Sequence, residues 1–370
     1  MPLLRLHESS ALNESAPLYA APIIASQKEA RATDAMLVSD LAKARVALLN
    51  ISEMVRDEIN RDAVALTKPD FIASVLKDIT NVALSSVNAT MRYAIGDSWS
   101  ELTIDDCVPI AGYVSENDLG LYKDRKFTIN IDEIRKSNIE PIQHLRELLK
   151  MELKKTDTNP FVFQIFEIAT HEIFHSIQEN RMALNFHMKG FDLELALANG
   201  MFRIEFFKTH FRVFVEGGAK FVETYLGSAI DEKITERSMQ TETDNAFFAS
   251  FSLHTVSDFV YKNPRSVMRE LKKKSAYDQG LFIFAATMAA NGSFTETVRD
   301  MYYIARQGTY KDRNMYAILR EAFASGSIEK LKARLATLTQ STDQSSMGVP
   351  NEERENTNDA AKDLNCAKRP

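Results

Sequence analysis

Residues 157–182 read DTNPFVFQIFEIATHEIFHSIQENRM and carry the clearest fold signal in the chain. Asp157, Thr158 and Asn159 are polar residues of the kind that cap helices, and Pro160 follows at a position where a first helical turn tolerates proline. Apolar residues then flank the central HEIFH on both sides, which predicts a buried helix. This helix forms the centre of the predicted fold.

The HEIFH segment predicts a metal site. His171 and His175 are four residues apart, so they share one helix face with Cβ atoms roughly 5–6 Å apart. Two imidazoles at that spacing reach one tetrahedral zinc ion. Glu172 is rotated by about 100° around the helix, which suits a general base that takes a proton from a zinc-bound water. The segment therefore predicts one zinc ion per chain, with Glu172 as the catalytic base.

A catalytic zinc site needs a third protein ligand and one open position. Arg181 stands where a histidine six residues after His175 would supply that ligand, so this arrangement is excluded. Glu216 is the better candidate, because Gly217 and Gly218 follow it inside an apolar helical pattern. Each glycine costs a helix about 1 kcal/mol, a cost that makes sense if two helices must approach closely. We expect Glu216 to be the third ligand; the alternative is an exposed helical glutamate.

HEIFH followed by EGGAKF resembles the gluzincin metallopeptidases, in which a helix with Glu-Gly-x-Ala and an aromatic residue follows HExxH. The resemblance covers roughly residues 120–290 and is specific at these two segments. The longer spacing between the histidines and the glutamate resembles the poorly characterised predicted peptidases of this superfamily. The resemblance implies a zincin-like domain that hydrolyses peptide bonds of a peptide or protein substrate. It makes His171, His175 and Glu216 the zinc ligands and Glu172 the base.

Tyr277 is a second candidate catalytic residue. It opens AYDQGLFIF, and Tyr-x-x-Gly before an apolar helix is similar to a segment of the same predicted peptidases. A tyrosine hydroxyl there would donate a hydrogen bond to the oxyanion of a tetrahedral intermediate. The alternative is a packing role. His187 and His210 are further candidates for an oxyanion donor or for a hydrogen-bond partner of a ligand.

The segment KFTINI, residues 126–131, alternates apolar with polar residues. This period of two predicts a half-buried strand, and we place it at the edge of a small sheet. An extended peptide adds readily to such an edge. The strand precedes the HEIFH helix, which is the order that the resemblance implies for a substrate-binding strand. A purely structural strand is the alternative.

The chain divides into four predicted parts, listed in order: an extended or partly ordered segment at 1–33, a helical region at 34–95, a zincin-like catalytic domain at 96–340 and a disordered tail at 341–370. The predicted class is α+β, mainly helical, with a small mixed sheet before the HExxH helix. Helical patterns other than the HEIFH helix cover the following ranges: 35–59, 69–84, 192–227, 240–273, 276–290, 296–306 and 312–337.

Composition limits the partners. The formal net charge of −6 argues against a nucleic-acid binder, which needs a basic face. No apolar run approaches the ~20 residues of a membrane-spanning helix, and the N-terminus lacks the pattern of a signal peptide. Cys107 and Cys366 are too few to form a disulfide scaffold, which favours a reducing compartment. We therefore expect a cytoplasmic protein without nucleic-acid or membrane partners.

These patterns favour a zinc metallopeptidase over two alternatives. The first is a catalytically silent binding protein on a zincin scaffold, and the second is a helical interaction protein in which HEIFH arose by chance. Glu172 favours the enzyme, because a structural zinc site needs no base. Zinc binding requires neutral His171 and His175, so activity should fall on the acidic side.

Overall fold

The computed structural model describes residues 20–115, 118–182, 204–230, 239–251, 274–307, 310–313, 315–322 and 326–334. Several predictions concern residues outside these ranges: the extended segment at 1–19, the helical patterns at 192–203 and 252–273, the disordered tail at 341–370, and His187. Within them the chain is α+β: helices dominate, and one small mixed sheet is present. The predicted fold class is confirmed at that level.

Most of the predicted helices are confirmed within the described residues, although the helix predicted at 240–273 can be followed only to Phe251 and the helices at 131–138 and 140–149 are additional. A helical stretch at 326–334 falls inside the predicted range 312–337. Short 3-10 turns occupy Ala65–Thr67, Gly96–Ser98 and Ile104–Asp106. The α-helices are α1 (Ala20–Arg61), α2 (Pro69–Ile95), α3 (Ile131–Asn138), α4 (Glu140–Leu149), α5 (Lys155–Asn180), α7 (Ile204–Ala229), α8 (Met239–Phe251), α10 (Ala276–Asn291), α11 (Phe294–Gln307) and α12 (Met315–Ala322).

Helix α1 is longer than predicted. It begins at Ala20, so residues 20–33 of the segment expected to be extended are helical. Pro22 accounts for this difference, since it stands in the first turn, where a backbone N–H has no partner within the helix. The helix predicted at 35–59 is confirmed inside α1. Its buried side chains recur at helical spacing: Leu37, Leu41, Leu48, Val55 and Ile59.

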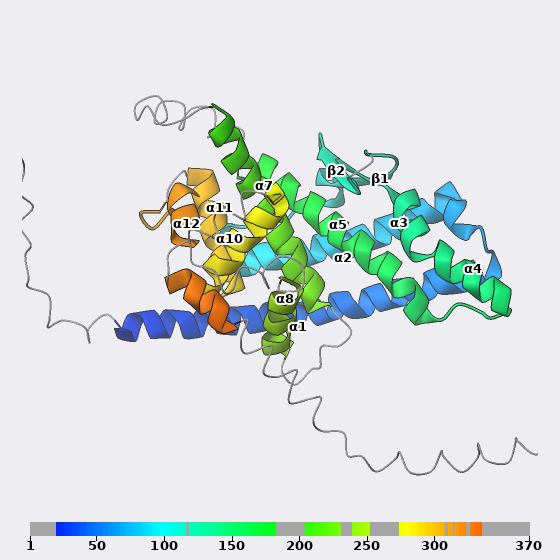
Figure 1. Ribbon diagram of the computed structural model, residues 1–370, viewed down its shortest axis with the longest axis horizontal. Coiled ribbons are helices and arrows are strands. Elements are labelled where there is room, and N and C mark those ends of the chain that lie inside the picture. Colours follow the sequence, from blue (N-terminus) through cyan, green and yellow to red (C-terminus); the bar gives the residue numbers. More distant parts are fainter. Residues whose placement is uncertain are drawn as a thin grey trace, which may run out of the picture.

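Helix α5 holds the HEIFH segment at the centre of the fold. It contacts α1, α2 and α7, and in Figure 1 it lies between the long α1 and the sheet. Most of its apolar side chains are buried, and Phe161, Phe166 and Phe174 are inaccessible to solvent. The predicted helix start is confirmed to within two residues, because α5 begins at Lys155. Burial on several sides gives this helix a fixed position from which its polar residues can act.

Three short strands form the sheet: β1 (Val108–Ala111), β2 (Gly120–Lys123) and β3 (Lys126–Ile129). Their order is β1-β3-β2, with β1 parallel and β2 antiparallel to β3. A two-residue turn joins β2 to β3. Asp124 and Arg125 both have positive φ there, as a tight hairpin of type I′ requires.

The alternation predicted for KFTINI is confirmed over Lys126–Ile129, but the strand ends there because Asn130 caps helix α3, and its predicted place in the sheet is wrong. Phe127 and Ile129 are fully buried, whereas Lys126 is exposed. However, β3 is the central strand, and β2 is the edge strand that packs on α5. The side-chain period shows which face of a strand is buried but not how many neighbours the strand has, so the edge position could not be read from it.

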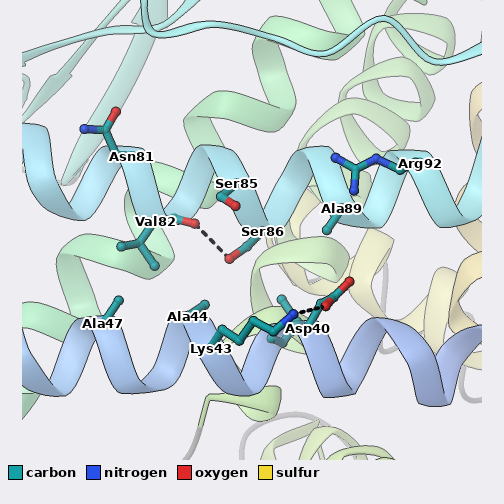
Figure 2. A pocket seen from close by; sticks show the side chains of 11 residues that line it. Asp40, Lys43, Ala44, Ala47, Asn81, Val82, Ser85, Ser86, Ala89 and Arg92 are labelled. Carbon is teal, nitrogen blue, oxygen red and sulfur yellow. Dashed lines mark hydrogen bonds and ion pairs between the residues drawn. The ribbon is translucent and has the colours of Figure 1, made fainter.

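A groove of about 430 Å³ lies between α1 and α2 (Figure 2). Small side chains line it, including Ala44, Ala47 and Ala89, and Lys43 forms an ion pair with Asp40 at 2.8 Å. Its lining comes from α1 and α2 alone, so the groove is separate from the polar residues of α5. Among the described residues, no helix combines the length and apolar character needed to cross a membrane.

Candidate metal centre

Helix α5 brings the two histidines together as its geometry requires. His171 Nε2 and His175 Nε2 lie 3.0 Å apart, and the ring planes are nearly perpendicular. Two nitrogens bound to one tetrahedral zinc at about 2.0–2.1 Å would be roughly 3.3 Å apart. The His171 side chain is buried and that of His175 is partly buried. Both rings therefore direct the same nitrogen to one point.

Glu216 reaches that point from α7. Its Oε2 lies 3.3 Å from His175 Nε2 and 3.6 Å from His171 Nε2. One ligand atom from each of the three residues lies within 4.8 Å of the other two. Burial opposes the charge of Glu216, but the two imidazoles outweigh it and hold the pKa of this carboxyl well below its usual range.

The donor set fits a metal ion. Glu216 Oε2 is buried and has no hydrogen-bond partner within the described part of the chain, although a buried carboxylate oxygen is costly to leave unpaired. Two imidazole nitrogens and one carboxylate oxygen are the protein ligands of several catalytic zinc sites, in which a fourth position stays open. A divalent cation between the three atoms would satisfy the unpaired oxygen.

Each histidine is also held at its other nitrogen. His171 Nδ1 lies 2.9 Å from Glu223 Oε2, and His175 Nδ1 lies 2.7 Å from Gln178 Oε1. Both partners accept, so Nδ1 carries a hydrogen and Nε2 is the nitrogen that a metal would bind. Burial disfavours the charged ring of His171, but the carboxylates of Glu216 and Glu223 outweigh it and raise its pKa to about 9, so a metal would replace a proton at Nε2.

Glu223 and Gln178 were not recognised in the sequence. A weak signal existed for each. Glu223 follows Glu216 by seven residues, which is two helical turns on the same face, and Gln178 follows His175 by three. Neither spacing identifies the partner atom, since that depends on how α5 and α7 cross.

Glu172 lies beside the three ligand candidates, against the sheet. Its side chain is buried, burial raises its pKa, and the nearby backbone N–H of Tyr122 opposes that rise. Gly120 of β2 makes room for it, because a Cβ at that position would lie 2.6 Å from Glu172 Oε1. The carboxylate is thus placed between the histidines and strand β2.

The outer edge of β2 faces this carboxylate. Asn130 N–H donates to the Leu119 carbonyl, so residues 119 and 121 pair with β3 and the alternate residues turn outward. The N–H of Tyr122 is one of these outward groups, and it meets Glu172. The outer edge of β2 and the Glu172 carboxylate are therefore neighbours.

Tyr277 comes to the site on α10. Its ring centroid lies 5.6 Å from that of His171. Burial and the charge of Glu216 raise the pKa of the Tyr277 hydroxyl above its ordinary value. Tyr277 therefore adjoins the ligand group, and its predicted catalytic role stays a prediction. His210 belongs to α7, but its side chain lies outside the described part of the structure, as does all of His187.

No protein-family model, curated protein or solved structure matches this chain. The interpretation of the centre therefore depends on the chemistry and geometry of its residues.

Proposed function

We propose that this chain is a zinc-dependent metallopeptidase that hydrolyses peptide bonds. The observation that carries the proposal is the convergence of His171 Nε2, His175 Nε2 and Glu216 Oε2 beside the buried carboxylate of Glu172. A closed structural site would use four protein ligands and needs no such carboxylate. Zinc, when bound, would polarise the scissile carbonyl and lower the pKa of a water molecule.

Glu172 moves the proton in this mechanism. Burial raises its pKa, which makes the carboxylate a stronger base than an exposed glutamate. It takes one proton from the attacking water as the oxygen bonds to the carbonyl carbon. It then gives that proton to the leaving nitrogen as the C–N bond breaks, so Glu172 is regenerated as a carboxylate. The products are an amine and a carboxylic acid, and the acid passes its proton to the amine or to solvent.

The substrate class is supported by strand β2. It is an edge strand in the described part of the chain, and an extended peptide would pair with its outward N–H and C=O groups as an added strand. Because Tyr122 lies on that edge and meets Glu172, a peptide paired there would run past the base. An extended backbone is the ligand that such an edge recognises.

Tyr277 would stabilise the oxyanion that forms when water adds to the carbonyl. Burial and the nearby charge of Glu216 raise the pKa of its hydroxyl, which keeps it protonated and able to donate. A donor of this kind contributes only when charge develops on the carbonyl oxygen. Tyr277 would therefore act on the chemical step rather than on zinc binding.

The first test is the metal content of the purified full chain, measured by elemental analysis. We expect one zinc per chain in the parent. Glu216→Ala and the double variant His171→Ala/His175→Ala should both hold much less. Glu172→Gln serves as the matched control, since it should keep zinc and lose activity.

Activity is tested by incubating the zinc-loaded parent with a peptide library and identifying cleaved products by mass spectrometry. Products that appear with the parent and not with Glu172→Gln support the peptidase. A parent that takes up no zinc after reconstitution overturns the metal site. A parent that binds zinc but cleaves nothing indicates a catalytically silent binding protein.

A further inference from the structure

The side-chain amide of Gln178 makes contacts through both its oxygen and its nitrogen, and these contacts connect helices α5 and α7. Gln178 is 2% exposed. Its Oε1 lies 2.7 Å from His175 Nδ1 on α5, and its Nε2 donates to the Val215 carbonyl on α7 at 2.9 Å. Val215 immediately precedes Glu216. One side chain therefore connects the second histidine to the backbone that carries the carboxylate.

The chemistry of these contacts fixes the state of His175. A backbone carbonyl only accepts, so the amide must present its NH₂ group to Val215 and its oxygen to the imidazole. The oxygen only accepts, so His175 Nδ1 must carry the hydrogen. In the neutral ring, His175 Nε2 then has the lone pair that a metal would bind, and it is the nitrogen that points to Glu216.

Gly218 provides the space for this arrangement. A Cβ at Gly218 would lie 3.2 Å from Gln178 Nε2 and 2.7 Å from Met301 Sδ. A side chain here would press on the amide from the surface of α7. The Val215 carbonyl can accept from Gln178 in addition to its helical partner, because it has two lone pairs. The second glycine of the EGG segment thus adjoins the histidine helix through Gln178.

We propose that Gln178 is a positioning residue, which locks the tautomer of His175 and at the same time ties that ring to the segment of α7 that presents Glu216. The inference rests on the proposed zinc centre and extends it. His171 is oriented differently, by the carboxylate of Glu223. Loss of Gln178 would free His175 to turn or to move its hydrogen to Nε2, where it would block the metal.

The test compares Gln178→Leu with Gln164→Leu in the full chain. Gln164 is a matched control, because its amide accepts from Asn138 Nδ2 at 2.6 Å and so also links α5 to another helix, away from the ligands. Zinc affinity is measured by competition with a chelator. We expect Gln178→Leu to weaken zinc binding about 10- to 100-fold, as outer partners of ligands commonly do, and Gln164→Leu to leave it unchanged.

A second readout needs no metal. The ¹⁵N chemical shifts of the His175 ring report which nitrogen carries the hydrogen. We expect hydrogen on Nδ1 in the metal-free parent and a mixture of tautomers in Gln178→Leu. If that variant does not fold, Gln178→Met replaces it, since methionine is similarly long and unbranched but lacks the amide.

Three outcomes decide between the claims. Parent-like zinc affinity and parent-like tautomers in a folded Gln178 variant overturn the inference. Equal losses of zinc affinity in the Gln178 and Gln164 variants overturn it too, because the effect would then be a general loss of helix packing. A parent that binds no zinc refutes the proposed function, whereas the tautomer shift would still show that Gln178 orients His175.

Discussion

Gly217 of α7 and Gly280 of α10 meet backbone to backbone, because a Cβ on either residue would overlap main-chain atoms of the other helix. Glu216 directly precedes the first glycine, and Tyr277 lies about one turn before the second. The helix crossing therefore sets the separation of the carboxylate from the phenol. The EGG and Tyr-x-x-Gly segments are the two halves of one contact.

Replacement of Gly280 by alanine should open this crossing. An added methyl in a closely packed contact typically costs about 1–3 kcal/mol. We expect that loss in the free energy of unfolding, together with peptide hydrolysis that falls further than zinc binding, because Tyr277 moves away from Glu216. Chemical denaturation and zinc titration measure the two effects.

Gly326→Ala is the control for that change. Nothing among the described atoms lies within 4 Å of a Cβ at Gly326, which begins the helical stretch 326–334. Its stability should stay level or rise by up to about 1 kcal/mol, the ordinary gain of alanine over glycine in a helix. Equal stabilities of Gly280→Ala and the parent would contradict the argument.

The sequence was most informative where one helix determines the geometry. Residues i and i+4 of a helix share a face whatever surrounds them, so His171 and His175 could be paired without a structure. The glycines after Glu216 indicated a close helix contact. They could not show its partners: Gly217 meets α10, whereas Gly218 meets Gln178 on α5 and Met301.

Contacts between different elements could not be predicted, because spacing within one helix or strand does not identify its neighbour. Glu223 could not be assigned to His171, because the pairing depends on the register between α5 and α7. The order of the three strands could not be predicted either. The sequence indicated β3 as an edge strand, whereas β3 is central and β2 lies at the edge. Hydrophobic period identifies the buried face of an element but not its neighbour across that face.

Glu172→Gln should separate binding from catalysis. The amide keeps the size of the side chain but cannot accept the proton of a water, and loss of a general base typically costs 10²–10⁴-fold in rate. Zinc content should match the parent, because Glu172 is not among the three ligand candidates. Elemental analysis measures the zinc content, and a peptide cleavage assay measures the rate. Zinc loss in this variant would mean that Glu172 is itself a ligand.

Tyr277→Phe tests the proposed oxyanion donor. The ring that packs at 5.6 Å from His171 is retained, and only the hydroxyl is removed. We expect kcat to fall about 10²- to 10³-fold with little change in KM, as for other single oxyanion donors. Steady-state kinetics with a cleaved peptide measure the split. A purely structural tyrosine would leave kcat near that of the parent.

Glu167 makes the free energy of unfolding depend on pH. A Cβ at Gly227 would lie 2.6 Å from Glu167 Oε1, so α7 closes over this carboxyl. Burial and the charge of Glu223 raise the pKa of Glu167 from 4.5 to about 7. The folded state therefore keeps a proton that the unfolded chain releases. The contribution of this proton to the free energy of unfolding is complete below pH 4.5 and is lost as the pH rises to about 7.

Glu167→Gln should remove that dependence. The amide resembles the protonated carboxyl, so the variant should match the parent near pH 4.5 and be more stable near pH 8. The full pKa shift would correspond to about 3 kcal/mol in the free energy of unfolding. We expect the variant to gain about 2 kcal/mol near pH 8, because part of the side chain stays in contact with solvent. Denaturant unfolding of the metal-free proteins at both pH values measures the difference. The exposed Glu179→Gln should show no such trend, and a Glu167→Gln variant that tracks the parent at both pH values would show that Glu167 is already ionised in the folded protein.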